Sequence, residues 1–146
     1  MDDLTTSPQT RLTDRLSRAG WQVEYRIQQV LQPAGVTIEQ WRVLCCLSDG
    51  AGHAMSEIAS YALVPRPTLT KQVDKLADRA LVYRHADHAD RRRVLVFLSA
   101  RGRQLFRELE VAVSNEEARI VDQLGAGDAD DLFALLGALI DRLPSA

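Results

Sequence analysis

The sequence predicts a mainly α-helical chain with one small β-hairpin. Apolar residues recur at steps of three and four through most of the 146 residues, which is the period of amphipathic helices. Between residues 81 and 99, two short runs rich in Val, Leu and aromatic residues flank a polar stretch, which is typical of two strands joined by a charged turn. Four helices are expected before this hairpin and two after it.

The first four helices are bounded by helix-breaking or capping residues. The first is expected over residues 11–31 and ends at the Gln-Pro-Ala-Gly cluster of 32–35. Thr37 and Gln40 have the spacing of a capping box for the second helix, which stops before Gly50. A short helix follows over 55–61. The fourth begins at the Pro-Arg-Pro of 65–67, because proline is tolerated in the first turn of a helix and not later, and runs to about residue 79.

The hairpin and two further helices complete the order of elements. Residues 81–86 and 94–99 are expected to be strands, joined by the charged turn 87–93. A long helix opens at 99–102 and continues to residue 124. The Gly-Ala-Gly of 125–127 breaks it, and Asp128 is expected to cap a final helix that stops at Pro144.

The bulk composition is that of an ordinary soluble globular protein. Apolar residues make up 46% and charged residues 26% of the chain. No run of the sequence reaches the roughly 18 consecutive apolar residues of a membrane helix, and the acidic start is unlike a secretory signal. The adjacent Cys45 and Cys46 fit a reducing compartment rather than a disulfide framework. A cytoplasmic protein with no membrane partner is therefore expected.

Charge is distributed unevenly along the chain, although the net charge is only −2. Residues 61–107 hold eleven Lys or Arg and four Asp or Glu, a balance of +7. The remaining residues hold seven basic and sixteen acidic side chains, a balance of −9. A basic centre between acidic ends indicates that one part of the molecule meets a polyanion while the other parts do not.

The order of elements in this basic centre is that of a winged helix-turn-helix. Two short helices joined by a tight turn are followed by a two-stranded hairpin. A helix fits the major groove of DNA, where the base edges can be told apart. A hairpin tip with arginines fits the narrow minor groove, where negative potential is concentrated.

Three stretches of the chain resemble the MarR family of bacterial transcriptional regulators. Residues 64–76 resemble the family's recognition helix, and residues 78–82 its exit into the wing. Residues 87–102 carry the wing signature, Asp-x-Arg followed by a strand and Leu-Thr-x-x-Gly. Five positions match this signature, with serine in place of threonine: Asp90, Arg92, Leu98, Ser99 and Gly102.

The resemblance implies a set of DNA contacts. Arg92 would enter the minor groove, held by a carboxylate–guanidinium pair with Asp90, and Arg91 and Arg93 would contact phosphates. The residues implied at the major groove are Arg66, Pro67, Thr68, Thr70, Lys71 and Gln72, with Lys75 nearer the DNA backbone.

The sequence departs from the family pattern at three positions around the fourth helix. Many members carry glycine where Leu63 and Ala80 stand, and a small capping residue where Pro65 stands. A proline has no side chain that can cap a helix. The departures bear on the geometry of the helix-turn-helix, not on its presence.

The ends of the chain are expected to form a homodimer. A terminal apolar helix with no later chain to cover it points to a partner. We expect residues 1–36 and 101–146 to be dimerisation segments on either side of a DNA-binding lobe at 37–100. The two recognition helices would then face a pseudo-palindromic operator. The residues expected in the interface are Leu12, Leu16, Leu132, Leu135, Leu136, Leu139, Ile140 and Leu143.

The resemblance also implies a small-molecule effector, because many family members bind small aromatic carboxylates near the end helices. Arg15 with Trp21 is the candidate pair for the carboxylate and the ring. Tyr25, Trp41 and His53 are further candidates, although the sequence favours a core position for Trp41. The alternative for the arginines of the first helix is a solvated face, or salt bridges to the acidic end helices of a partner copy.

Other functions are weighed against this interpretation. Cys45 and Cys46 suggest a thiol-based redox sensor, but they lie in an apolar stretch where cysteine is usually inert. His85, Asp87, His88 and Asp90 have metal-ligand chemistry but lie beside three arginines that would repel a cation, so no metal and no cofactor are expected. A winged helix that binds protein instead of DNA remains an alternative. Since the sequence has no phosphate-binding loop and no spaced nucleophile and base, an enzyme is not expected.

Overall fold

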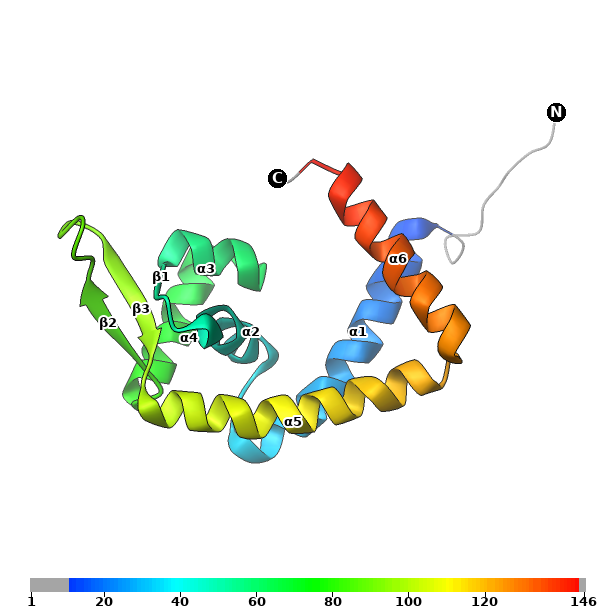
Figure 1. Ribbon diagram of the computed structural model, residues 1–146, viewed down its shortest axis with the longest axis horizontal. Helices are drawn as coiled ribbons and strands as arrows, with labels where there is room; N and C mark the ends of the chain where they lie inside the picture. The colour runs from blue at the N-terminus through cyan, green and yellow to red at the C-terminus, as the bar shows by residue number, and fades with distance from the viewer. Residues whose placement is uncertain (1–10, 145–146) are drawn as a thin grey trace.

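The chain forms a U, and a computed structural model describes its residues 11–144. The long helix α5 (Ala100–Asp122) is the base of the U. Helices α1 (Leu12–Leu31) and α6 (Ala126–Arg142) form one arm, and the lobe that carries the sheet forms the other (Figure 1). No helix among the described residues is long and apolar enough to cross a membrane.

All six predicted helices are present. Helix α2 is Ile38–Cys46, α3 is Met55–Ala62 and α4 is Arg66–Asp78. Short 3-10 turns, η2 (Gln32–Ala34) and η3 (Leu47–Asp49), extend α1 and α2 at the predicted breaker clusters. The first ten residues of the predicted N-terminal segment 1–36 lie outside the described residues.

The predicted helix caps are confirmed at α2 and wrong at α6. Thr37 and Gln40 form the reciprocal capping box of α2. Helix α6 begins at Ala126 after Gly125, whose φ of 81° is readily adopted only by a residue without a Cβ atom. Asp128 therefore lies inside the first turn, where its negative charge interacts favourably with the helix dipole but its side chain does not cap the helix.

The hairpin belongs to a three-stranded antiparallel sheet in the order β1-β3-β2. Strands β2 (Val82–Ala86) and β3 (Val94–Leu98) are the predicted pair, with Val82 opposite Leu98. The third strand, β1 (His53–Ala54), pairs with β3 and was not predicted. Two residues are too few to show the alternation that marks a strand in a sequence.

Two of the departures from the family pattern lie at left-handed backbone positions. Leu63, which ends α3, has a φ of 56°, and Ala80, which follows α4, has a φ of 55°. This conformation costs a residue with a Cβ atom roughly 1 kcal/mol relative to glycine. The helix-turn-helix therefore keeps a glycine-type backbone with two non-glycine residues.

The wing is fastened to α5 by the Leu-Ser-x-x-Gly motif. Ser99 caps α5 by accepting the backbone N–H of Gly102 at 2.9 Å, and its hydroxyl donates to the carbonyl of Ala80 at 2.7 Å. A Cβ atom on Gly102 would lie 2.0 Å from the carbonyl oxygen of Leu81. Only glycine allows this approach, so the motif sets how the wing and α5 meet.

A continuous core holds α1 to α4 and the sheet together. Its fully buried side chains come from every helix of the lobe, from the end of α1 and from the sheet. The largest are Leu31, Leu44, Leu47, Ile58, Leu69, Leu76, Leu81 and Leu98. Helix α4 is thus held on its inner face while its outer face stays exposed.

Candidate nucleic-acid interface

Helix α4 presents a polar face to solvent. Leu69, Val73 and Leu76 recur at steps of four and three and are fully buried, so they fix the inner face of the helix. Most of the residues predicted to meet DNA lie away from this stripe, whereas Thr68 and Gln72 are half-buried at its edge. The exposed members of the predicted set are Arg66, Pro67, Thr70, Lys71 and Lys75.

Gln72 contacts α2 with one end of its amide. Its Oε1 accepts a hydrogen bond from Nε2 of Gln40 at 3.0 Å. Gln40 is itself buried, and its Oε1 accepts the backbone N–H of Thr37 in the capping box. The sequence indicated the capping box but gave no sign that the same glutamine reaches α4.

The wing tip is shaped by two aspartates. Asp87 Oδ1 accepts the backbone N–H of Ala89, and Asp90 Oδ1 accepts that of Arg92, both at 3.0 Å. Asp87 and Arg93 close the turn through a backbone hydrogen bond of 2.8 Å. Short aspartate side chains commonly hold the backbone two residues ahead in this way.

The predicted ion pair between Asp90 and Arg92 is wrong. The described residues contain no Asp90–Arg92 pair among their salt bridges, and Asp90 contacts the backbone of Arg92 instead. The two-residue spacing favours this local turn because the carboxylate reaches the N–H without ordering a long side chain. The Arg92 guanidinium is consequently left exposed at the tip.

Two ion pairs tie the wing to the helices. Arg93 Nη2 lies 2.5 Å from Glu57 Oε1 of α3, and Arg84 Nη2 lies 2.5 Å from Asp74 Oδ1 of α4. His53 contacts the same Glu57, with its Nδ1 3.3 Å from Oε2. Arg93, predicted to contact phosphate, is therefore engaged within the protein.

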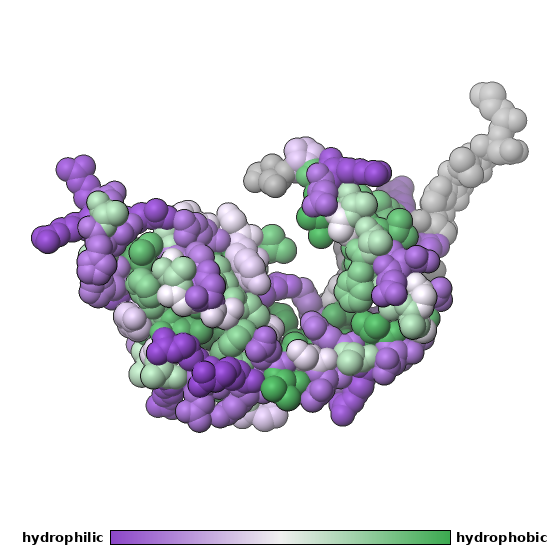
Figure 2. Space-filling view, viewed as in Figure 1, coloured by the Kyte–Doolittle hydropathy of each residue, from purple (hydrophilic) through white to green (hydrophobic). Residues whose placement is uncertain are grey.

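The remaining basic side chains of this surface form no ion pair with the described residues. They are Arg66, Lys71 and Lys75 on α4, and Arg91 and Arg92 on the wing tip. Figure 2 shows hydrophilic residues projecting from the wing tip. An exposed helix face and a cationic hairpin tip on one lobe match the two grooves of a DNA duplex in shape and charge.

The two cysteines are not activated thiols. Burial raises the pKa of the Cys45 thiol to about 12, helped by the negative charges of Glu110 and Glu117. Burial and the nearby Asp49 also raise the pKa of Cys46. Both side chains remain protonated at neutral pH, which disfavours the redox-sensor hypothesis because the thiolate is the reactive form.

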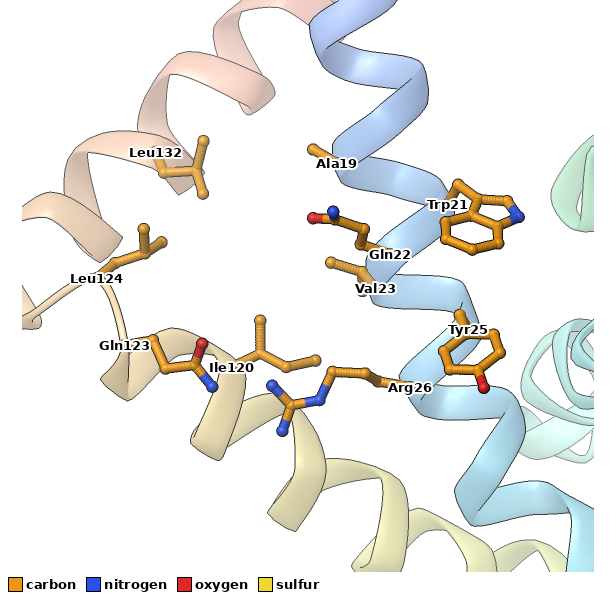
Figure 3. A pocket seen from close by; sticks show the side chains of 10 residues that line it. All are labelled: Ala19, Trp21, Gln22, Val23, Tyr25, Arg26, Ile120, Gln123, Leu124 and Leu132. Carbon is orange, nitrogen blue, oxygen red and sulfur yellow. The ribbon is translucent and has the colours of Figure 1, made fainter.

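The arm of the U contains a second candidate site. A cavity of about 480 Å³ lies between α1, α5 and α6 and is lined mainly by apolar side chains, including Val23, Ile120, Leu124 and Leu132 (Figure 3). Arg26 reaches into this region from α1, and its Nη2 lies 2.5 Å from Oε1 of the buried Glu116. The cavity thus combines an apolar wall with one cation.

The predicted effector residues are only partly brought together. Trp21 and Tyr25 border the cavity and stack at a centroid distance of 5.5 Å, on the side of α1 away from Leu124 and Leu132 (Figure 3). Arg15 is exposed on α1 and is not among the lining residues, whereas Arg26, which was not predicted, is. The sequence could not single out Arg26, because it is one of several arginines on this helix.

Trp41 and His53 lie elsewhere. Trp41 is in the core and stacks on Phe106 at 5.3 Å, in agreement with the core alternative. His53 lies at the base of the wing, with its Nε2 2.8 Å from Asp49 Oδ2. Across residues 11–144, no cluster of three or more His, Cys, Asp or Glu side chains is placed to hold a metal ion.

The apolar residues of α6 are left uncovered. Within the described chain, Ala129 is the only buried residue of this helix. Leu135 is 70% exposed and Ile140 73%, and Leu132 and Leu143 are also exposed. Figure 2 shows hydrophobic residues on the surface of this arm. Leu136 and Leu139 are half-buried, and Leu12 and Leu16 extend the apolar surface onto α1.

Comparison with known proteins gives concordant results. The family model described as MarR family matches residues 36–94. The transcriptional repressor Rv2887 of Mycobacterium tuberculosis is 31% identical over 124 residues, which cover 85% of this chain and 89% of that protein. A solved structure of Rv2887 in complex with p-aminosalicylic acid has a TM-score of 0.75 at 28% identity, covering 89% of this chain and 98% of that one.

A DNA complex is also among the similar structures. The transcriptional repressor CouR bound to a 23-mer DNA duplex has a TM-score of 0.84 at 26% identity, and the match covers 96% of this chain and 99% of CouR. The similarity therefore extends over the arm as well as the winged lobe.

Proposed function

The chain belongs to the MarR family of transcriptional regulators, and on that premise we propose that it is a cytoplasmic repressor that binds a pseudo-palindromic operator as a homodimer and leaves it when a small molecule binds. The main support for this proposal is the exposed polar face of α4 beside the cationic wing tip. The named relatives are regulators, and we assign the chain no catalytic role.

In the proposed complex, α4 lies in the major groove and the wing tip in the minor groove. Arg66, Thr70 and Lys71 face the base edges, while Lys75 lies nearer the phosphates. Pro67 lies on the same helix face, with Thr68 and Gln72 at its edge. Arg92 enters the minor groove beside Arg91, whereas Arg93 positions the wing through Glu57. The solved complex of CouR with a 23-mer DNA duplex supports duplex DNA as the partner.

We infer that the segments 1–36 and 101–146 pair with a second copy through α1 and α6, and that the lobe 37–100 binds DNA. A helix with so much uncovered apolar surface is stabilised when a second copy covers it. A two-fold dimer presents its two recognition helices to half-sites about one turn of DNA apart. The operator half-sites are then expected to be related by the same symmetry.

The proposed effector is a small aromatic or phenolic acid. The Rv2887 structure holds p-aminosalicylic acid, which supports this class of molecule. In this chain, the apolar wall of the arm cavity suits an aromatic ring, and the guanidinium of Arg26, which is paired with Glu116, lies beside it. Trp21 and Tyr25 offer a stacking surface on the other side of α1 (Figure 3). Release from DNA requires that the ligand bind more tightly to the conformation that does not fit the operator.

The test of DNA binding is an affinity measurement on the DNA that flanks the protein's own gene, across a salt series. Arg92→Ala should weaken binding and reduce the slope of log K against log salt by about 2, because each dimer loses two cations that displace counterions. Arg142→Ala, at the exposed end of α6, is the matched control and should leave the slope unchanged. A shallow slope with no sequence preference in the wild type would contradict the proposal.

A further inference from the structure

The capping box of α2 fixes the orientation of a buried amide. The backbone N–H of Thr37 donates to Gln40 Oε1 at 3.1 Å, and Thr37 Oγ1 accepts the backbone N–H of Gln40 at 3.2 Å. A backbone N–H can only donate, so it must meet the oxygen of the amide and not its nitrogen. Gln40 is 5% exposed, and turning its amide over would leave that N–H without an acceptor inside the protein.

The nitrogen of the same amide sets the orientation of Gln72 on α4. Gln40 Nε2 donates to Gln72 Oε1 at 3.0 Å. Because Nε2 is only a donor, Gln72 must turn its oxygen toward α2 and its own Nε2 away from it. The backbone N–H of Thr37 therefore fixes the orientation of the Gln40 amide, which in turn fixes that of the Gln72 amide.

The nitrogen of Gln72 is left available to a ligand. Among the hydrogen bonds of residues 11–144, none uses Gln72 Nε2. No polar side-chain atom in this part of the chain is buried without a partner, so this nitrogen is not fully buried. Gln72 follows Lys71 and Thr68 on the helix that faces DNA in the proposed function.

We propose that Gln72 reads the major groove as a hydrogen-bond donor, and that Gln40 is the positioning residue that sets this polarity. The inference rests on the proposed DNA binding through α4. Guanine O6 and N7 and thymine O4 accept hydrogen bonds, whereas cytosine presents only its N4 donor. A donor from Gln72 therefore suits guanine or thymine at the contacted position and disfavours cytosine, because two donors would face each other. Adenine presents an acceptor (N7) and a donor (N6), so it can bond to either orientation of the Gln72 amide.

Gln40→Glu is the matched polarity swap. A glutamate at this position keeps the capping box, because its carboxylate still accepts the N–H of Thr37. It has no N–H to give, so Gln72 turns its amide over and donates to the carboxylate. The oxygen of Gln72 then faces the groove, where it accepts from cytosine N4 and no longer suits guanine or thymine.

The experiment selects bound duplexes from a pool with a randomised central segment and compares four proteins: wild type, Gln72→Ala, Gln40→Glu and the double variant. Gln72→Ala identifies the base pair that Gln72 contacts. At one position per half-site, this variant should lose a preference of roughly tenfold for guanine or thymine over cytosine. Gln40→Glu should reverse the preference at that position alone. The double variant should match Gln72→Ala, because the introduced carboxylate acts only through Gln72.

Gln40→Met covers the case in which the glutamate variant fails to fold. It keeps the length of the side chain but frees the Gln72 amide, so discrimination should disappear at that position while the other positions keep theirs. An unchanged profile at that position in Gln40→Glu or Gln40→Met, or no effect of Gln72→Ala anywhere, overturns this inference and leaves the proposed function standing. A wild-type protein that selects no sequence overturns both.

Discussion

Arg93, just before β3, and Glu57 on α3 form an ion pair, with Nη2 2.5 Å from Oε1, at the base of the wing. Glu57 also accepts the backbone N–H of Ala54 at 3.0 Å through Oε2. One carboxylate thus joins α3, the short strand β1 and the charged turn. The wing is oriented by a side chain from outside the hairpin.

This carboxylate makes stability depend on pH. The backbone N–H of Ala54, and then Arg93, lower the pKa of Glu57 below its usual range. A carboxyl group with a lowered pKa stabilises the folded protein at pH values above its unfolded-state pKa of about 4. This contribution is lost as the pH falls through its folded-state pKa. Chemical denaturation of wild type and Glu57→Gln should therefore show a smaller loss of unfolding free energy on acidification for the variant. Equal losses in the two proteins would contradict the role of Glu57.

Gly102 is expected to tolerate no side chain. Gly102→Ala would place Cβ 2.0 Å from the Leu81 carbonyl oxygen, so the wing or α5 must shift. We expect a loss of about 2–4 kcal/mol in unfolding free energy, measured by urea denaturation. Gly20→Ala in α1 is the control, since nothing lies within 4 Å of its added Cβ, and it should gain about 0.5–1 kcal/mol. Similar effects at both glycines would refute the close-approach explanation.

Ala80→Gly should stabilise the protein, although glycine usually destabilises. The φ of 55° at Ala80 costs a residue with a Cβ roughly 1 kcal/mol. Glycine removes this cost, and part of the gain is offset because glycine has more conformational entropy in the unfolded chain. A small rise in melting temperature is expected. Ala118→Gly, an exposed position within α5, should instead lose about 1 kcal/mol. The explanation fails if both substitutions lower the melting temperature alike.

Leu135→Asp should dissociate the proposed dimer. The side chain is 70% exposed on α6, so the substitution costs the folded protomer little but places a charge in the proposed apolar interface. Sedimentation velocity should show a shift from dimer to monomer, with weaker operator binding. Val94→Asp, at the exposed start of β3, is the control for a new charge and should remain dimeric. A variant at Leu135 that sediments with the wild type would exclude this face from the interface.

The helices and strands could be predicted from the sequence where several residues repeat one hydrophobic pattern. Leu69, Val73 and Leu76 recur at helical spacing, and the structure buries all three. The motif residues Ser99 and Gly102 indicated a cap and a tight approach, and both have a local geometric cause. By contrast, β1 spans only two residues and is defined by pairing with β3, about forty residues later along the chain, as Val96 opposite His53 shows.

The candidate site was predicted in composition but not in its internal contacts. The exposed cations of α4 and the wing were identified from residue type and order. Arg93 was assigned to phosphate, but its partner Glu57 is 36 residues away and could not be found by spacing. The same holds for Arg26 and Glu116, which are 90 residues apart.

The helices, the hairpin, the basic centre and the family could be predicted from the amino-acid sequence, because periodicity, capping residues and turn-forming aspartates act over a few neighbouring residues. The contacts between polar groups depend instead on how distant segments pack. Asp90 holds a backbone N–H and not the Arg92 guanidinium, and Gln40 caps α2 while turning the Gln72 amide outward. Hydrogen bonds depend on position within a few tenths of an ångström, and that position is set by the packing of helices distant in the chain.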